Sequence, residues 1–519
     1  MLLKASSTIW LLAGISAAAT LNPSAPVATQ TGLLTGTLSS NHQVAVYKGI
    51  PYAAPPVGPL RWRPPQPAKK WNGVLKADHF SRNCVQPLVR SLLPWTPEFM
   101  LRNGVSEDCL YLNIWASARR HAHPLPVYVY IYGGAFTGGA GDVSVYNGEH
   151  LARRGIIVIT FNYRVGVLGF LADPELTRES PHHSSGNYGL LDQVAALRWV
   201  QQNISAFGGD PKRVTVGGQS AGAISVSLLV ASPLAKGLFR GAVAESGSGI
   251  AGIPLETLAQ GEKTGEQFVH SKGVHSVAEL RKMSWRKLTA EPPKGMRFDP
   301  IVDGWLVPRT PVEAFVRGKQ NDVPTITGWN RDDSFGRPTT IDAFRSRVRK
   351  RYGSLASEFL KLYPANSNKQ ALASYKQAGR DRNRVSMYLW AKTRARTAKA
   401  PAYTYFFTRA IPWPQHPEFG AFHTGEVPYI FDNLYRLPRP WQPVDHKVAR
   451  IFSSFLIDFV NTGDPNGAGL PHWRAYDPTA KTTMEIGAHC KPIPLASPAR
   501  EQFWVKYFHS PQSKSAPFL

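Results

Sequence analysis

The chain has 519 residues, of which 43% are hydrophobic and 18% are charged. This composition is close to that of ordinary soluble proteins and excludes a disordered or collagen-like chain. Lysine and arginine exceed aspartate and glutamate by 25 charges, which raises the question of an anionic partner. The three cysteines are too few for a disulfide scaffold and form no CxxC or Cys/His cluster with zinc spacing, so no metal site is expected.

The N-terminus has the pattern of a secretory signal peptide. One lysine precedes an apolar run of small and aliphatic residues, and Ala17 and Ala19 fit an A-x-A cleavage site. The apolar run is shorter than the roughly 20 residues that a membrane-spanning helix needs. We therefore expect residues 1–19 to be a signal peptide and the protein to be secreted or periplasmic. Residues 20–519 show no repeat, low-complexity tract or boundary and are expected to form a single domain.

Short apolar runs then alternate with stretches of helical periodicity along the chain. Strands are expected at 127–132, 156–162, 213–216, 241–246, 324–329 and 402–407, and helices at 190–204 and 221–232. Several of these strands are apolar without alternation, which is typical of a strand buried on both faces of a sheet. The pattern predicts an α/β protein whose large, mostly parallel sheet is covered by helices.

The clearest chemical motif is G-x-S-x-G, formed by Gly218, Ser220 and Gly222 between an expected strand and an expected helix. In that context the serine sits on a turn so sharp that side chains at the flanking glycines would collide with backbone. A serine hydroxyl is a poor nucleophile at neutral pH, so it needs a base, an orienting carboxylate and donors for the developing oxyanion.

A candidate for the donors follows the strand at 127–132. Tyr132-Gly133-Gly134-Ala135-Phe136 is a loop of mainly small residues, whose bare N–H groups can approach a substrate oxygen. Taken alone, this segment would be a plain turn at a strand end. Considered together with the serine turn, it is the candidate for the missing half of an oxyanion hole.

Nine motifs of the chain occur in the order found in one family of hydrolases. They are GIPYAAPPVGPLRWRPP from Gly49, SEDCLYLNI from Ser106, YGGAF from Tyr132, NYRVGVLGFL from Asn162, GNYGLLDQVAALRWV from Gly186, GGDP from Gly208, GGQSAG from Gly217, GAFHTGEVPYIF from Gly420 and NTGDPN from Asn461. From about Thr31 to Phe508, the chain resembles the type-B carboxylesterase family, the cholinesterase-like branch of the α/β-hydrolases. The resemblance implies the α/β-hydrolase fold, with a large, mostly parallel twisted sheet flanked by helices and a small N-terminal β meander.

The resemblance also assigns roles to individual residues. Ser220 corresponds to the nucleophile, and His423 corresponds to the general base that takes the serine proton and returns it to the leaving alcohol. Gly134, Ala135 and Ala221 correspond to the three N–H donors of the oxyanion hole. No cofactor is implied.

The acid of the triad is where this sequence departs from the family pattern. The family usually has N-x-D-E-G after a strand, whereas this chain has Asn330-Arg331-Asp332-Asp333-Ser334. By register Asp333 replaces the glutamate, and Asp332 is the alternative. The order Ser220, Asp333, His423 follows the α/β-hydrolase order of serine, acid and histidine.

Cys84 and Cys109 match the first disulfide of the family, in a loop beside the active-site entrance. An exported protein can keep such a bond. The loop carries five large apolar residues that either form a wall of the substrate site or pack as ordinary core, namely Leu92, Leu93, Trp95, Phe99 and Met100.

Two features bear on the substrate. Gln219 stands before the nucleophile, where cholinesterases carry glutamate, so the site lacks a negative charge for a quaternary ammonium and choline esters are not expected. Residues 345–399 contain 15 Lys and Arg against only Glu358 and Asp381. This basic segment is either a solvated helical face, or a patch that draws the enzyme weakly to an anionic envelope surface or attracts esters that bear carboxylates.

These observations predict a secreted serine carboxylesterase that hydrolyses small-molecule carboxylic esters through an acyl-enzyme. Nucleic acid is not an expected partner, because the chain contains no recognised module for it. Two alternatives stay open. One is a non-catalytic adhesion or binding module of the same fold. The other is the same mechanism acting on a carbamate, an amide or the ester of a complex natural product.

Overall fold

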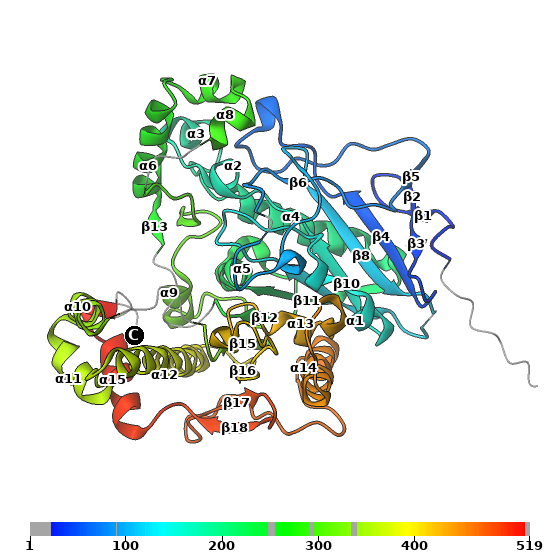
Figure 1. Cartoon of the computed structure of the whole chain (residues 1–519). Helices are drawn as coiled ribbons and strands as arrows, with labels where there is room; N and C mark the ends of the chain where they lie inside the picture. The colour runs from blue at the N-terminus through cyan, green and yellow to red at the C-terminus, as the bar shows by residue number, and fades with distance from the viewer. Residues whose placement is uncertain are drawn as a thin grey trace, which may run out of the picture.

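The computed structural model describes residues 22–89, 91–119, 121–247, 255–290, 295–333 and 340–513. The predicted signal peptide lies outside these described residues. In the described part, eleven strands form one central sheet in the order β18-β17-β16-β15-β12-β11-β9-β10-β8-β4-β3 (Figure 1). Their bounds are β3 Thr37–Leu38, β4 Val44–Pro51, β8 Tyr111–Ser117, β9 Leu125–Ile131, β10 Ile157–Phe161, β11 Gly209–Gln219, β12 Gly241–Glu245, β15 Thr325–Asn330, β16 Ala402–Phe407, β17 Thr482–Ile486 and β18 Lys491–Pro494.

The middle of the sheet is parallel and its two margins are antiparallel. Strands β10, β9, β11, β12, β15, β16 and β17 pair in parallel. Antiparallel pairs follow from β10 through β8 and β4 to β3 on one side, and between β17 and β18 on the other. The parallel strands β9, β10 and β12 are almost entirely buried, as their continuous apolar sequences predict.

Helices cover this sheet and extend beyond its ends. The longer ones are α4 Tyr188–Asn203, α5 Ala221–Ala231, α6 Leu258–Ser271, α10 Ile341–Tyr352, α12 Asn368–Ala395, α14 Pro443–Thr462 and α15 Pro498–Phe508. The shorter ones are α1 Glu149–Arg153, α2 Gly166–Phe170, α3 Pro174–Glu179, α7 Val277–Lys282, α8 Trp285–Thr289, α9 Pro311–Val316, α11 Ala356–Leu362 and α13 Val427–Ile430. In Figure 1, α10, α11, α12 and α15 group together at one side of the molecule, away from α6, α7 and α8.

All six expected strands and both expected helices are present. The largest difference is β11, which runs over Gly209–Gln219 instead of only four residues. Its glycines resemble turn residues in the sequence, yet Gly217 pairs with Tyr130 of β9 and Val243 of β12. A Cβ atom at Gly217 would collide with the ring of Tyr128, so the packing of a neighbouring strand, and not local preference, explains this glycine.

Two small sheets lie near the N-terminal half of the central sheet. The expected N-terminal meander is a three-stranded sheet of β1 Val27–Ala28, β2 Leu33–Thr35 and β5 Val74–Lys76, in which only β1 and β2 are antiparallel. Strands β6 Asn83–Cys84 and β7 Val105–Ser106 pair at the base of the loop that Cys84 and Cys109 close. These two cysteines form the predicted disulfide.

Among the described residues, no helix is both long and apolar enough to cross a membrane. The same residues contain no cluster of three or more histidine, cysteine, aspartate or glutamate side chains that could hold a metal ion.

Candidate active site

Ser220 occupies the sharp turn that joins β11 to α5. Its backbone has φ 58° and ψ −122°, a conformation that costs a non-glycine residue about 1–3 kcal/mol. The N–H of Ser220 donates to the carbonyl oxygen of Glu245 at 2.8 Å, which fixes the turn against β12. A Cβ atom at Gly218 would lie 2.6 Å from the carbonyl oxygen of Ile131, and one at Gly222 would overlap the same oxygen. Both glycines of the motif are therefore required by close packing on β9.

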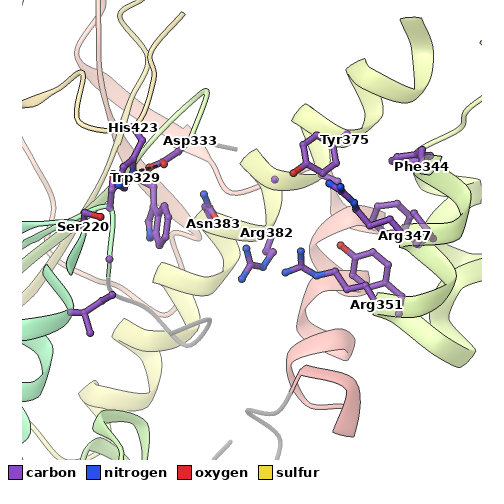
Figure 2. A pocket seen from close by; sticks show the side chains of 18 residues that line it. Ser220, Trp329, Asp333, Phe344, Arg347, Arg351, Tyr375, Arg382, Asn383 and His423 are labelled. Carbon is purple, nitrogen blue, oxygen red and sulfur yellow. Dashed lines mark hydrogen bonds and ion pairs between the residues drawn. The ribbon is translucent and has the colours of Figure 1, made fainter. Parts of the chain in front are cut away.

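His423 and Asp333 meet beside this serine. Asp333 follows β15 and His423 lies in the loop before α13, and the Nδ1 atom of His423 is 2.6 Å from Oδ1 of Asp333. The Asp333 side chain is fully buried, and 11% of the His423 side chain is exposed. Ser220 and His423 line the same cavity and lie next to each other in Figure 2.

The charge of Asp333 sets the proton affinity of the imidazole. Burial lowers the pKa of His423, but the negative charge of Asp333 and its hydrogen bond outweigh burial and leave the pKa above the ordinary value of 6.5. Asp333 thus stabilises the imidazolium that forms when His423 takes a proton from a nucleophile.

The neighbouring carboxylate, Asp332, is engaged elsewhere. It forms ion pairs with Arg331 at 3.0 Å and with Arg380 at 2.7 Å, and it accepts a hydrogen bond from the N–H of Ala421 at 2.9 Å. Of the two aspartates that the sequence offered, the geometry places Asp333 behind the imidazole.

The three expected oxyanion donors surround Ser220. Gly134 and Ala135 have φ of 122° and 54°, which turn the loop after β9 sharply beside the serine. A Cβ atom at Gly133 would lie 2.8 Å from Cβ of Ser220, so only glycine permits this approach. Ala221 is the first residue of α5 and directly follows the serine. Within the described part of the chain, the N–H groups of Gly134, Ala135 and Ala221 have no hydrogen-bond acceptor, as donors reserved for a substrate oxygen require.

Gln219 completes the surroundings of the imidazole. Its side chain is buried, and its Nε2 atom lies 3.3 Å from Nε2 of His423, the ring nitrogen that is not bonded to Asp333. The amide adds no charge here, in keeping with the expectation drawn from the sequence.

Two buried glutamates that were not predicted from the sequence lie behind the triad. Glu245 ends β12, and Glu426 lies three residues after His423 within the GAFHTGEVPYIF motif. Glu426 accepts hydrogen bonds from Asn330 and, at 3.4 Å, from the hydroxyl of Ser246. Burial and the charge of Asp333 raise the pKa of Glu426 to about 7, and burial together with Glu426 raises that of Glu245 well above its ordinary value. A glutamate at the end of an otherwise apolar strand was the available signal for Glu245.

Two cavities meet at Ser220 and His423. One, of about 480 Å³, is lined by the oxyanion loop and by the loop between Cys84 and Cys109. The latter contributes the apolar residues Val89, Leu92, Trp95, Phe99, Met100 and Leu101. Of the five residues named from the sequence, Leu93 alone does not line this cavity; it is 49% exposed. The other cavity, of about 390 Å³, extends towards α10 and α12, and its described lining combines apolar side chains with three arginines and two tyrosines (Figure 2).

Comparisons with known proteins agree with this site. Residues 23–504 match the model of the carboxylesterase family. The fumonisin B1 esterase of Sphingopyxis macrogoltabida is 36% identical over 489 residues, covering 89% of this chain and 86% of that protein. The para-nitrobenzyl esterase of Bacillus subtilis is 34% identical, covering 88% of this chain and 94% of that protein. A solved PNB esterase structure matches with a TM-score of 0.78 at 31% identity, covering 93% of this chain and 99% of that one.

The predicted α/β-hydrolase fold and the prediction of a carboxylic ester hydrolase are confirmed by these matches. Because the family model spans nearly the whole chain and relatives above 30% identity cover most of it, the protein belongs to the carboxylesterase family.

Proposed function

We propose that the protein is an exported serine carboxylesterase that hydrolyses carboxylic esters through an acyl-enzyme on Ser220. The observation that carries this proposal is the 2.6 Å contact between His423 and Asp333, beside a serine held in a strained turn. A binding module of the same fold would have no use for this arrangement, so the geometry favours catalysis over adhesion.

The chemistry follows from the positions of these groups. The hydroxyl oxygen of Ser220 attacks the ester carbonyl while its proton passes to Nε2 of His423. The negative charge that develops on the carbonyl oxygen is stabilised by the N–H groups of Gly134, Ala135 and Ala221. The bond to the leaving alcohol then breaks, and His423 returns the proton to that oxygen. Water, activated by His423 in the same way, releases the carboxylic acid from the serine.

Export is part of the proposal. The N-terminal pattern of a signal peptide supports it, and so does the disulfide between Cys84 and Cys109, since such bonds persist in oxidising compartments.

The substrate is proposed to be a small-molecule ester with an apolar part. The cavity of about 480 Å³ beside the oxyanion loop is lined mainly by apolar side chains, and it can hold an aliphatic or aryl group. The relatives named as fumonisin B1 esterase and para-nitrobenzyl esterase support ester hydrolysis as the reaction class.

The test compares the wild type with Ser220→Ala and Ser227→Ala on 4-nitrophenyl esters of increasing acyl length. Ser227 lies on the same helix, and its hydroxyl donates to the carbonyl of Ala223, so its removal should leave activity near the wild-type level. We expect Ser220→Ala to lose about 10⁶-fold in kcat, because without the nucleophile only binding and the oxyanion hole remain. A fluorophosphonate should label Ser220 in the wild type, as mapped by peptide mass. Label on another serine, or full activity in Ser220→Ala, would refute the assignment.

A further inference from the structure

The second cavity at Ser220 ends in a cluster of arginines. Arg347 and Arg351 come from α10 and Arg382 comes from α12, and all three line the cavity that Ser220 and His423 also line. In Figure 2 the catalytic residues lie at one end, Arg347 and Arg351 lie at the other, and Arg382 lies between them. A ligand attached at Ser220 would therefore meet the guanidinium groups several bonds away from its ester carbonyl.

The described walls of this cavity contain one acidic side chain. Among its described lining residues the only carboxylate is Asp333, which is bonded to His423. Asp381, the nearest acid in sequence to Arg382, instead forms ion pairs with Arg384 at 2.7 Å and with Arg500 at 3.8 Å. The Nε atom of Arg382 is shielded from solvent and has no hydrogen-bond partner in the described part of the chain.

Burial and a neighbouring positive charge disfavour the protonated form of Arg382. Burial and the positive charge of Arg351 lower the pKa of Arg382 to about 10, so it stays protonated at neutral pH at a cost in free energy. An anion placed between these groups would remove that cost. Arginine is suited to this task because its planar fork donates two parallel hydrogen bonds to a carboxylate.

Aromatic rings lie beside the guanidinium groups of Arg347 and Arg351, two residues that are exposed to solvent. Arg347 lies 5.6 Å from the ring centroid of Tyr375, and Arg351 lies 5.7 Å from that of Tyr352. Such contacts restrict flexible side chains, and a preorganised site loses less entropy on binding.

We propose that the Arg347, Arg351 and Arg382 cluster binds carboxylate groups of the substrate, so that the preferred substrates are esters with an apolar group on one side and one or more carboxylates on the other. The inference rests on the proposed function, because it takes Ser220 to be the point at which the ester is cleaved. For the basic segment 345–399, it favours the attraction of carboxylate-bearing esters over attraction to an anionic envelope surface.

The first experiment compares two substrates that differ in one charge. The 4-nitrophenyl hemiester of adipic acid bears a free carboxylate, and its methyl ester is the neutral counterpart. We expect the wild type to prefer the anionic substrate by about 10- to 100-fold in kcat/KM, as a charge-assisted hydrogen bond to arginine provides. Arg382→Gln and Arg351→Gln should each lose most of this preference, measured as the ratio of kcat/KM for the anionic ester to kcat/KM for the neutral ester.

Arg349→Gln is the matched control. Arg349 lies on α10 and is exposed, as Arg347 and Arg351 are, but it does not line the cavity, and its replacement changes the net charge equally. We expect it to keep the preference. An equal loss in Arg349→Gln would overturn the proposal, because the effect would then come from long-range attraction by the whole basic molecule. Measuring the same preference in about 0.5 M NaCl is a separate check, because that salt screens long-range attraction. We expect the preference of the wild type to persist there.

A second pair of substrates places the charge on the alcohol side, namely the butyrate esters of 4-hydroxybenzoic acid and of its methyl ester. The pair that shows the Arg382-dependent preference identifies which side of the ester occupies the cavity. If the wild type hydrolyses both neutral esters but prefers neither anionic one, this inference is wrong and the proposed function stands. If it hydrolyses none of the four esters, the proposed function itself fails.

Discussion

The raised pKa of the His423 imidazole is due mainly to Asp333. Asp333 lies fully buried against Nδ1, whereas Asp332, one residue earlier, is neutralised by Arg331 and Arg380. A side chain one methylene shorter than glutamate therefore still reaches the imidazole. The difference between the two aspartates arises from what lies around each of them, since their chemical groups are identical.

Asp333→Asn tests this role. We expect kcat to fall by about 10⁴-fold, because an amide neither fixes the required tautomer nor stabilises the imidazolium. The wild-type kcat/KM should rise with pH through a pKa above 6.5, because only neutral His423 can act as a base and Asp333 raises its pKa. In Asp333→Asn the residual activity should show this rise at lower pH, because the carboxylate that favoured the protonated imidazole is gone. Steady-state kinetics from about pH 5 to 9 gives both results.

Asp332→Asn is the comparison for this prediction. It removes two ion pairs but not the contact with His423. We therefore expect it to lower the free energy of unfolding and to reduce kcat far less than Asp333→Asn does. A larger loss of kcat in Asp332→Asn than in Asp333→Asn would reverse the assignment of the acid.

The loop between Cys84 and Cys109 combines a structural and a functional role. Its base is closed by the disulfide and by the pairing of β6 with β7, and its apolar side chains line the cavity beside the oxyanion donors. Trp95 ties it to the catalytic loop, since its indole N–H donates to the carbonyl of His423 at 3.2 Å and to the hydroxyl of Thr424 at 3.1 Å. Opening the loop should therefore disturb both stability and substrate binding.

Replacing both cysteines by serine should lower the free energy of unfolding by about 3–4 kcal/mol, because the unfolded chain gains the freedom of an open loop. Chemical denaturation measures this loss. The KM for a long-chain ester should rise more than that for an acetate ester, since the longer acyl chain depends more on the wall that Leu92 and Phe99 help to form. An unchanged denaturation midpoint, or equal KM changes for both esters, would contradict this dual role.

The excess of positive charge over the whole molecule is unevenly spread. Residues 345–399 form much of α10, α11 and α12, which group at one side of the structure (Figure 1). Three of their arginines line the cavity that leads to Ser220. Part of the basic segment therefore lies beside the active site, which the net charge alone does not predict.

The proposed export concerns the whole chain and has a direct test. Expressed with its own N-terminus in a bacterium, the protein should leave the cytoplasm and begin at Thr20 after cleavage behind Ala19. Mass spectrometry of the N-terminal peptide from the exported fraction measures this. A cytoplasmic protein that retains residues 1–19 would show that the apolar run is not an export signal.

The sequence by itself determined the features that depend on neighbours along the chain. The apolar runs of β9 and β10 indicated buried strands, because a strand covered on both faces has no polar side. The serine turn was recognisable because its two glycines, the strand before it and the helix after it are all local. The family motifs then identified His423 and the oxyanion loop.

Only the tertiary structure decided what depends on side chains brought together from distant segments. It placed Asp333 instead of Asp332 against His423, and it paired Glu245 with Glu426 across 181 positions of the chain. It also brought arginines of α10 and α12 into one cavity with Ser220. The physical reason is that charge, burial and hydrogen bonding act over a few ångströms in space, and spacing along the sequence does not report which distant side chains share that space.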